Sequence, residues 1–251
     1  MVHIVGAGCG AADLITLRGK RLLEAADVIV YAGSLVNTDL LGYAKPGCEK
    51  YDSAKMTLEE IVAVLAEAEH AGKTAVRLHS GDPSLYGAIG EQMREFDRLG
   101  IPYDITPGVS AFAGAAAALK TEYTLPGVSQ SVVITRAAGR TPVPAGEELR
   151  SFAAHHATMV LFLSTGLLEA VTEELTAGGI PADTPAAIVY KASWPDEQVL
   201  RCTLGTLAQT AREHGITKTA LIVVGDVLGE SFERSKLYDP SFATQFREAR
   251  P

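Results

Sequence analysis

The sequence has no excess of positive charge. Its 251 residues include 22 Lys and Arg against 30 Asp and Glu, which gives a formal net charge of −8. General nucleic-acid binding needs a basic face that neutralises phosphates, so this balance argues against a nucleic-acid partner. A small anionic ligand is still compatible with it, because a local basic pocket can outweigh the distant average.

Cysteine is scarce, and the short motifs of metal sites and hydrolases are missing. Cys9, Cys48 and Cys202 lie far apart, and no two of them form a C-x-x-C pair. This spacing suggests neither a zinc site nor a disulfide framework, so we expect three free thiols and no metal. The chain also lacks G-x-S-x-G and H-E-x-x-H, and therefore offers no hydrolytic machinery.

No hydrophobic run is long enough to span a bilayer. The most apolar stretch, GVSAFAGAAAAL, is much shorter than the roughly 20 residues that a hydrocarbon core of about 30 Å requires. The amino-terminus has no basic region ahead of its apolar start, and Asp13 follows early, which is unlike a signal peptide. These features predict a soluble cytoplasmic protein without a membrane partner.

Short apolar runs alternate with longer amphipathic segments along the chain. HIVGAG, DVIVYAG and TAVRLHS are typical of buried strands, and TLEEIVAVLAEAEHAGK is typical of a helix with a capping box at Thr57 and Glu60. Such alternation indicates an α/β protein with mostly parallel or mixed sheets. The texture changes within 118–127, so we expect two α/β domains, residues 1–118 and 119–251, with a ligand cleft between them.

The segment Val5–Gly19, VGAGCGAADLITLRG, contains G-x-G-x-x-A directly after the first expected strand. A dinucleotide-binding loop would need a helix that opens at the third small residue and an acid at the end of the second strand. Here the best helix start is Thr16, and the second strand ends with Tyr31, Ala32 and Gly33. Because both tests fail, we interpret the glycines as a sharp bend or a close backbone approach.

Three further stretches carry small or polar residues at expected strand ends. RLHSGDPSLYGA (77–88) is either a tight turn in which Asp82 caps the next helix or a loop that offers backbone groups to a ligand. TPGVSAFAGAAAAL (106–119) is either a tightly packed helix or a face open to a flat ligand. VYKASWPDE (189–197) is either a surface staple around Trp194 or a site loop. The residues alone leave both alternatives open at each stretch.

Together, in order and over essentially the whole chain, these stretches resemble the tetrapyrrole methylases, the S-adenosylmethionine-dependent methyltransferases of sirohaem and cobalamin synthesis. VGAGCGAADLITLRG resembles the first motif of that family, RLHSGDPSLYGAIGEQ the second, and IPYDITPGVSAFAGAAAAL the third. YAGSLV, RLHSGDP and LPGVSQSVVITR are most similar to the branch that methylates C11 of precorrin-4 or cobalt-precorrin-4. One departure is visible, because the usual Gly-Pro-Gly-Asp-Pro is replaced by Gly8-Cys9-Gly10-Ala11-Ala12.

The resemblance implies two α/β domains, a homodimer, and S-adenosylmethionine bound in the cleft between the domains, with S-adenosylhomocysteine as the product. It also implies which residues meet the cofactor, several of them through the backbone. By position these are Cys9, Ser80, Gly81, Asp82, Leu85, Ser110, Ala111, Leu163, Ser164, Ala192, Thr219 and Ala220.

For the reaction itself the chain offers few side chains. Transfer of an activated methyl group to carbon needs positioning more than a nucleophilic side chain, so a sparse catalytic signature is what this chemistry would leave. His79 is a candidate for proton transfer by position only. A tetrapyrrole carries several carboxylates, for which we expect Arg136, Arg140 and Lys191 as partners.

Three alternatives stay open at this point. Methylation at C20 or C17 of a precorrin, or at C1 and C7 of uroporphyrinogen III, would use the same cofactor motifs. A nicotinamide oxidoreductase would need the dinucleotide loop that the late helix start at Thr16 disfavours. A protein that binds the cofactor or a porphyrinoid without turnover would also carry these motifs.

Overall fold

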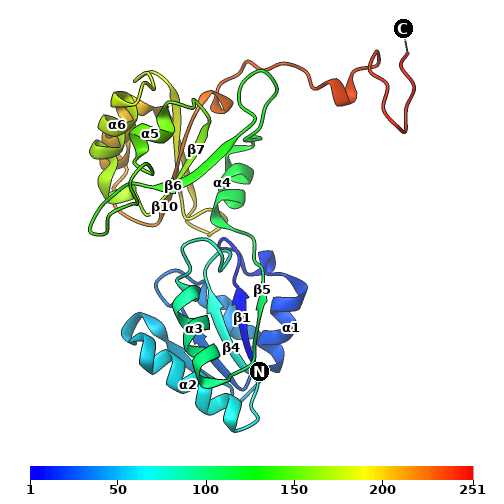
Figure 1. Ribbon diagram of the computed structural model, residues 1–251, viewed down its shortest axis with the longest axis vertical. Helices are drawn as coiled ribbons and strands as arrows, with labels where there is room; N and C mark the ends of the chain where they lie inside the picture. Colours follow the sequence, from blue (N-terminus) through cyan, green and yellow to red (C-terminus); the bar gives the residue numbers. More distant parts are fainter. Residues whose placement is uncertain (251) are drawn as a thin grey trace. The chain divides into compact units, whose positions relative to one another are not determined.

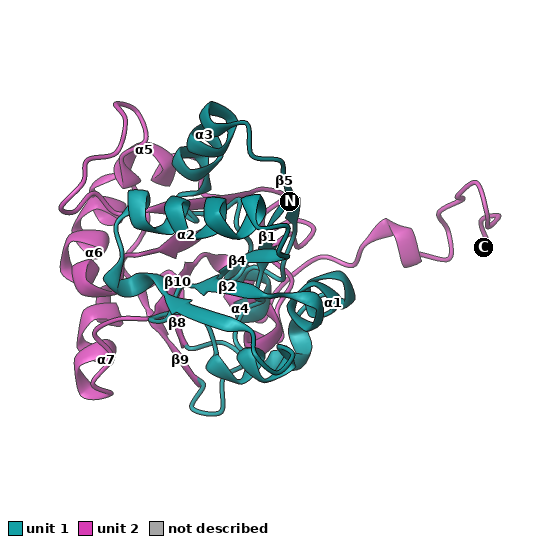
Figure 2. Cartoon of the chain, turned by 90° about the horizontal axis from the view of Figure 1, so that it is seen from below, with its two compact units in different colours: residues 1–115, 191–197 teal, residues 116–190, 198–251 magenta. Residues whose placement is uncertain are grey.

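The computed structural model describes residues 1–250 of the chain as two compact units (Figures 1 and 2). Unit 1 comprises Met1–Ala115 together with Lys191–Glu197, and unit 2 comprises the remaining described residues, 116–190 and 198–250. Each unit is built around one five-stranded sheet. The α/β class that the alternating pattern predicts is therefore confirmed.

The sheet of unit 1 is entirely parallel. Its strands lie in the order β3-β2-β4-β1-β5. They are β1 (Val2–Gly6), β2 (Val28–Tyr31), β3 (Glu49–Asp52), β4 (Ala75–His79) and β5 (Tyr103–Thr106). All five strands therefore end at the same edge of the sheet, which is where open parallel sheets usually bind ligands.

Helices cover both faces of this sheet. α2 (Leu58–His70) and α3 (Ile89–Leu99) pack on one face, and α1 (Leu17–Ala25) packs on the other. Successive strand residues point to opposite faces, so Val28 belongs to the core beneath α2 whereas Ile29 belongs to the core beneath α1. Burial on both faces explains why β1 and β2 are almost continuously apolar, whereas β3 at the edge of the sheet is polar and largely exposed.

The helix ends follow local signals in the sequence. Thr57 and Glu60 form the expected capping box at the start of α2. At the start of α1 the Thr16 hydroxyl accepts a hydrogen bond from the amide of Gly19. Gly100 ends α3 in the left-handed region, with φ of 68°. Because α1 begins only after Thr16, its N-terminus does not open at the glycines of the first motif, as the dinucleotide test requires.

The sheet of unit 2 is mixed, with strand order β6-β7-β10-β8-β9. Its strands are β6 (Val132–Arg136), β7 (Thr158–Phe162), β8 (Pro185–Tyr190), β9 (Gln198–Thr203) and β10 (Ala220–Val224). β6 and β7 are parallel, whereas β10 runs antiparallel to β7 and β8, and β8 antiparallel to β9. The expectation of mostly parallel or mixed sheets is therefore confirmed, with a parallel sheet in unit 1 and a mixed sheet in unit 2.

The remaining helices belong mainly to unit 2. α5 (Leu149–Ala153), α6 (Leu168–Ala177) and α7 (Leu207–Glu213) pack on one face of its sheet. α4 (Ala111–Leu119) belongs to both units, because the first continuous stretch of unit 1 ends within it, at Ala115. Short 3-10 helices occupy Ala12–Leu14, Thr38–Tyr43, Ser53–Lys55, Thr165–Leu167, Leu204–Thr206, Asp226–Leu228 and Lys236–Tyr238. Among the described residues, no helix is long and apolar enough to cross a membrane.

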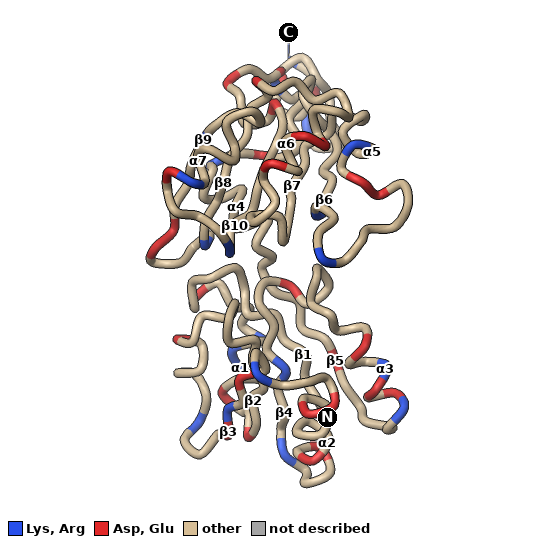
Figure 3. The backbone as a smooth tube through the Cα atoms, turned by 90° about the vertical axis from the view of Figure 1, so that its left-hand side faces the viewer, with Lys and Arg blue, Asp and Glu red and all other residues tan. Residues whose placement is uncertain are grey.

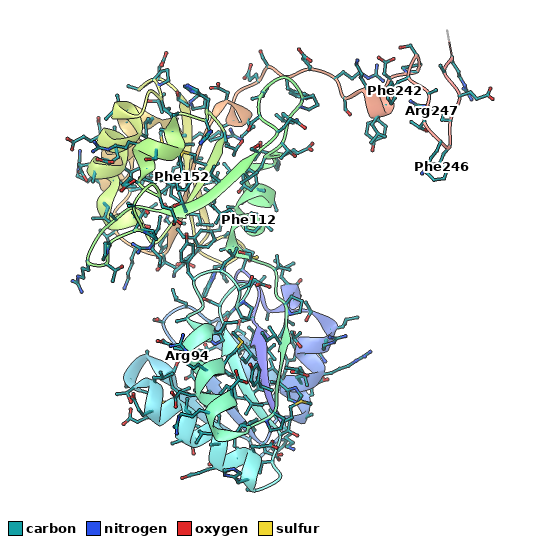
Figure 4. All side chains as sticks on the ribbon, viewed as in Figure 1. Arg94, Phe112, Phe152, Phe242, Phe246 and Arg247 are labelled. Carbon is teal, nitrogen blue, oxygen red and sulfur yellow. The ribbon has the colours of Figure 1, made fainter. Side chains whose placement is uncertain are left out.

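The described chain ends in an arm, residues 230–250, that extends from unit 2 (Figure 1). Its root is held by a hydrogen bond from the amide of Glu233 to the carbonyl of Pro126. Farther along, the Arg247 guanidinium donates to three main-chain carbonyls of the arm itself. The arm is thus folded on itself, and its Phe246 side chain is 90% exposed (Figure 4).

Candidate functional site

Three turns that follow β1, β4 and β5 meet backbone to backbone at the carboxyl edge of the unit 1 sheet. Gly8 and Gly81 exchange two main-chain hydrogen bonds, with N–O distances of 3.2 and 2.8 Å. Gly6 and Gly108 approach so closely that a Cβ on Gly6 would lie 2.6 Å from the Cα of Gly108. The interpretation of the first-motif glycines as a close backbone approach is therefore confirmed.

The Asp82 carboxylate ties the turn after β4 to the turn after β5. Its Oδ2 accepts a hydrogen bond from the amide of Gly108 at 2.9 Å, and its Oδ1 accepts from the amide of Ser84 at 2.9 Å and from the Ser84 hydroxyl. Burial raises the pKa of this carboxyl, but the hydrogen bonds from Ser84 and Gly108 more than offset the burial, so the pKa lies below its ordinary value. α3 begins at Ile89 after Ala88, so Asp82 does not cap that helix and this alternative is wrong.

The other predicted cofactor residues of the second and third motifs surround these turns. Ser80 and Leu85 are half-buried on either side of the Gly-Asp pair. Ser110 is 7% exposed, and its carbonyl accepts hydrogen bonds from two amides in the first turn of α4. Ala111 opens that helix and is half-buried. The edge thus presents short side chains and main-chain groups rather than long polar side chains.

The first-motif turn, residues 9–11, is covered by the loop Lys191–Glu197. Cys9 is 9% exposed, and its Sγ lies 3.3 Å from the hydroxyl oxygen of Ser193. The same hydroxyl accepts a hydrogen bond from a main-chain amide of the turn at 2.9 Å. Ala192, in the same loop, is 6% exposed. The fold thereby brings Cys9 and the segment around Ala192 together, although more than half of the chain separates them.

His79 and Arg77 lie on the α3 side of β4, and both residues are 5% exposed. Arg77 donates to the side-chain oxygen of Gln92 at 3.0 Å and to the carbonyl of Val30 at 3.1 Å. Nε2 of His79 has no hydrogen-bond partner among the described residues. Burial, and then the charge of Arg77, lower the pKa of His79 to about 3, so the ring is neutral at neutral pH. Its role in proton transfer stays a prediction.

In unit 2 the mixed topology gathers predicted residues at one edge of the sheet. Arg136 ends β6 and pairs with Phe162, the last residue of the parallel strand β7. β10 runs antiparallel to β7, so its first residue, Ala220, lies at this same edge and pairs with Tyr190 at the end of β8. The predicted residues that flank these strand ends are Leu163, Ser164 and Thr219.

Ser164 and Leu163 differ in what they expose at this edge. Ser164 is fully buried; its hydroxyl accepts from the amide of Ala137 at 2.8 Å and donates to the carbonyl of Phe162 at 2.7 Å. The Ser164 hydroxyl is therefore engaged on both sides within unit 2. Leu163 is 66% exposed and has φ of 53°. A large apolar side chain is thus exposed on an energetically costly backbone.

Left-handed backbone at residues other than glycine concentrates in the predicted site segments. Eight described residues of this kind have positive φ, and six of them lie in or beside those segments. The six are Tyr86, Ala88, Leu163, Lys191, Ser193 and Thr219. Such conformations cost energy, persist where surrounding contacts over-determine them, and cluster at ligand sites. The pattern supports these segments as a site independently of any family resemblance.

The three predicted substrate cations are held in different ways. The Arg136 guanidinium donates to three main-chain carbonyls of the loop 137–142, at distances of 2.7 to 3.2 Å, and so braces the loop that follows β6. Arg140, within that loop, is exposed. Lys191 pairs with Asp196 at 2.6 Å. Of these three residues, Arg140 is the one that is exposed.

The described residues contain no group of three or more His, Cys, Asp or Glu side chains that could hold a metal ion. Figure 3 shows Lys and Arg interspersed with Asp and Glu along both units rather than gathered into one basic face. What the two sheet edges offer is main-chain N–H and C=O groups, small side chains and the exposed Leu163. This donor set suits an organic cofactor with polar and apolar parts.

Comparison with known proteins decides the family. Residues 1–208 match the model of the Tetrapyrrole (Corrin/Porphyrin) Methylases. The chain belongs to the tetrapyrrole methylases. The resemblance carried by the three motifs is confirmed, and the close backbone contact of Gly8 with Gly81 joins the first two motifs of this tetrapyrrole methylase.

Two curated relatives match this tetrapyrrole methylase over nearly its whole length. The cobalt-precorrin-4 C(11)-methyltransferase of Methanocaldococcus jannaschii is 52% identical over 249 residues, which cover 99% of this chain and 96% of the relative. The precorrin-4 C(11)-methyltransferase of Mycobacterium tuberculosis (strain H37Rv) is 52% identical over 239 residues, which cover 94% and 95% of the two chains.

Solved structures of tetrapyrrole methylases share the fold. The X-ray structure of a cobalt precorrin-4 methyltransferase of cobalamin biosynthesis matches with a TM-score of 0.89 and 46% identity, covering 91% of this chain and 96% of that one. Uroporphyrin-III C-methyl transferase from Thermus thermophilus, complexed with S-adenyl homocysteine, matches with a TM-score of 0.75 and 29% identity, covering 91% and 93%. The predicted two-sheet α/β architecture of this family is therefore confirmed.

Sequence reasoning missed three residues that shape the turns of this tetrapyrrole methylase. Gly108 touches Gly6, and the Pro-Gly pair signalled a turn there but not its neighbour. Asn37 donates through Nδ2 to the carbonyl of Gly10 at 3.1 Å. Ser193 contacts the same turn from the connection between β8 and β9. Nothing local marks Asn37 or Ser193, because each acts on a segment remote in sequence.

Proposed function

We propose that this protein is an S-adenosylmethionine-dependent methyltransferase that methylates C11 of precorrin-4 or cobalt-precorrin-4 in cobalamin biosynthesis. The observation that carries the proposal is 52% identity over 99% of the chain to a C(11)-methyltransferase. A relative named for the cobalt-free substrate is equally similar, at 52%. The substrate is therefore defined by its methylation position, and the experiment below separates its two forms.

We assign the cofactor to residues at the two sheet edges, with many contacts through the backbone. In unit 1 these are Cys9, Ser80, Gly81, Asp82, Leu85, Ser110, Ala111 and Ala192, and in unit 2 they are Leu163, Ser164, Thr219 and Ala220. The close packing of the unit 1 glycines and the left-handed backbone at Leu163 and Thr219 support the assignment.

When bound, S-adenosylmethionine supplies a methyl group that is already activated on a positively charged sulfur. The chain itself has to hold the nucleophilic ring carbon in line with that methyl group, and orientation of this kind contributes up to about 7–11 kcal/mol. The turns after β1 and β4 are suited to this task because their mutual hydrogen bonds fix them in place. His79 stays the candidate for proton transfer by position; burial lowers its pKa to about 3, so its ring is neutral at neutral pH, and its Nε2 has no hydrogen-bond partner among the described residues.

For the tetrapyrrole carboxylates we propose Arg136, Arg140 and Lys191. Guanidinium groups match carboxylates with two parallel hydrogen bonds. The exposed position of Arg140 supports a direct contact, and the hydrogen bonds of Arg136 support a part in shaping the same loop. Lys191 would exchange its pairing with Asp196 for a substrate carboxylate.

We also propose that the protein works as a homodimer in the cytoplasm, with domains divided between residues 118 and 119. The end of the first continuous stretch of unit 1 at Ala115 supports a division in this region, with Lys191–Glu197 returning to unit 1. The homodimer rests on the family resemblance, and sedimentation of the purified protein would test it.

The test is methyl transfer from S-adenosylmethionine with an isotopically labelled methyl group. Precorrin-4, cobalt-precorrin-4 and uroporphyrinogen III are offered in separate reactions, and the product is analysed by mass and by NMR assignment of the new methyl position. We expect one labelled methyl group at C11 of precorrin-4 or of its cobalt form. Transfer to another carbon or to uroporphyrinogen III, binding without transfer, or binding of NADH in place of S-adenosylmethionine would each refute the proposal.

A further inference from the structure

Ser193 lies at the centre of the contact between the loop Lys191–Glu197 and the turn that follows β1. Its hydroxyl accepts a hydrogen bond from the amide of Ala11 at 2.9 Å and lies 3.3 Å from Sγ of Cys9. Its own amide donates to the Glu197 carboxylate at 2.6 Å. The side chain therefore contacts two residues of the turn while its backbone is anchored within the loop.

The turn is clamped on two sides. A Cβ on Gly10 would lie 2.3 Å from the indole ring of Trp194 and 2.6 Å from the carbonyl oxygen of Ala192, so the loop rests directly on the Gly10 backbone. On the other side, a Cβ on Gly114 of α4 would lie 2.8 Å from Sγ of Cys9. These distances leave the turn no space for an alternative path.

The turn has little stiffness of its own. Cys9 stands between Gly8 and Gly10, and glycine leaves the backbone conformationally free. No proline restricts φ within this stretch. A restraint on the orientation of its main-chain groups therefore has to come from outside, and the loop Lys191–Glu197 is in contact with it.

The loop keeps Ser193 in place at an energetic cost. Ser193 has φ of 65° and Lys191 has φ of 47°, both in the left-handed region. Residues other than glycine remain there where their contacts over-determine the conformation, and such strain gathers at functional sites. Glycine at position 193 would relieve this strain, yet it would lack the hydroxyl that holds the turn.

We propose that Ser193 is a positioning residue, which holds the main-chain groups of Cys9–Ala11 in the orientation that the methyl donor requires. The inference rests on the proposed function and deepens it by naming what prepares the cofactor side of the site. Ser193 acts through the turn, and the hydroxyl is the group that matters.

The experiment compares Ser193→Ala and Ser193→Gly with the unaltered protein and with Ser151→Ala, which removes an exposed hydroxyl of α5 (Ser151 Oγ to Glu148, 3.3 Å). S-adenosylhomocysteine binding is measured by calorimetry, and KM and kcat are measured with S-adenosylmethionine and precorrin-4. Losing one hydrogen bond should weaken S-adenosylhomocysteine binding about five- to tenfold in both Ser193 variants. KM for S-adenosylmethionine should rise by a similar factor in both Ser193 variants, whereas their KM for precorrin-4 should stay unchanged. The Ser151→Ala variant should match the unaltered protein in S-adenosylhomocysteine binding and in both KM values.

The glycine variant separates positioning from folding. Because it removes backbone strain, its thermal midpoint should stay at or above that of Ser193→Ala. Unchanged cofactor binding in both variants, or an equal loss for cofactor and tetrapyrrole that follows the thermal midpoint, would overturn the positioning role.

The two proposals fail in different ways. If the unaltered protein binds no S-adenosylhomocysteine or transfers no methyl group, the proposed function fails. If the unaltered protein does both and the Ser193 variants bind the cofactor as tightly, the proposed function stands and the role of Ser193 is refuted.

Discussion

At the scale of single residues, glycines allow the turns after β1, β4 and β5 to touch, and they do so for two different reasons. Gly81 needs the left-handed region, with φ of 61°. Gly108 has no room for a side chain, because a Cβ there would lie 2.2 Å from the carbonyl oxygen of Gly81. The Ser-Gly-Asp-Pro sequence suggests the positive φ of Gly81. The lack of space at Gly108 cannot be recognised locally, because it depends on the neighbouring turn after β4.

Replacing Gly108 with alanine should damage both stability and cofactor binding. The new methyl group would force apart the backbones at Gly6 and Gly81, and overpacking of this kind should cost about 3 kcal/mol of unfolding free energy. Gly90 in α3 is the matched control, since nothing lies within 4 Å of a Cβ there and alanine should stabilise the helix by about 0.5 kcal/mol. Urea unfolding and S-adenosylhomocysteine titration measure the two effects. Equal stability of the two alanine variants would contradict the close approach.

His79 should make the protein sensitive to acid. Its pKa is about 3 when folded and 6.5 in the reference state, because burial and Arg77 disfavour the charged ring. As the pH falls, the unfolded chain therefore binds a proton at His79 before the folded protein does. The free energy of unfolding is unaffected by this group above about pH 6.5 and decreases on acidification toward pH 3. The loss should reach about 2 kcal/mol between about pH 7.5 and pH 5.

Urea unfolding of the unaltered protein and of His79→Gln at several pH values would measure this dependence. The glutamine variant should lose this part of the acid dependence, whatever its absolute stability at neutral pH. Parallel stability curves for the two proteins would show that the neutral ring of His79 is not the source.

At the scale of elements, the loop after β6 is organised by the last residue of that strand. The Arg136 guanidinium gathers the carbonyls of 137–142, and Ser164 fixes the start of the loop through the amide of Ala137. The exposed Arg140 is presented by this frame. Removal of Arg136 should therefore disturb the loop itself, whereas removal of Arg140 should affect only the ligand that it contacts.

Alanine at Arg140 should raise KM for the tetrapyrrole about tenfold, because one charged hydrogen-bonded contact is lost, and should leave S-adenosylhomocysteine binding intact. Alanine at Arg136 should weaken tetrapyrrole binding as well, again without loss of cofactor binding, and should also loosen the loop. Steady-state kinetics and calorimetry separate the two ligands. Equal loss of both ligands, or of neither, would count against a substrate role for this loop.

Several elements follow from local sequence because their signals act over a few residues. The capping box of α2 and the glycine that ends α3 are examples. The direction of the strands in unit 2 does not follow in this way. β8 and β9 are recognisable as strands, yet their antiparallel pairing follows from the connection Lys191–Glu197, which is too short to hold a crossover helix.

At the scale of the whole molecule, the carboxyl-terminal arm, residues 230–250, contributes no side chain to the hydrophobic core of unit 2. Its largest apolar side chains, including Phe242 and Phe246, are exposed, and Arg247 satisfies carbonyls of the arm itself (Figure 4). The contact at Glu233 and Pro126 lies at its root. Little apolar surface of the unit 2 core therefore depends on the arm.

Ending the chain after Glu233 should change the free energy of unfolding by less than about 0.5 kcal/mol, as is usual for exposed segments. Calorimetric unfolding of the shortened and full chains would measure this difference. A fall of several degrees in the thermal midpoint of the shortened chain would show that the arm covers part of a core.

Local patterns in the chain were enough to establish the α/β class, the start of α1 at Thr16 and the failure of the dinucleotide interpretation. They were also enough to locate the three motifs, because each motif is a contiguous stretch with its own turn chemistry. The family resemblance rested on those stretches in order, and the match over residues 1–208 agrees with it.

Only the tertiary structure decided which backbones touch. Gly8 meets Gly81 because β1 and β4 are neighbours in the sheet, and strand order is not written in any local pattern. Ser193 reaches Ala11 because the connection between β8 and β9 packs with unit 1. Contacts between remote segments depend on the whole topology, whereas turns and caps depend on a few neighbouring residues. That difference in range separates what could be predicted here from what had to be observed.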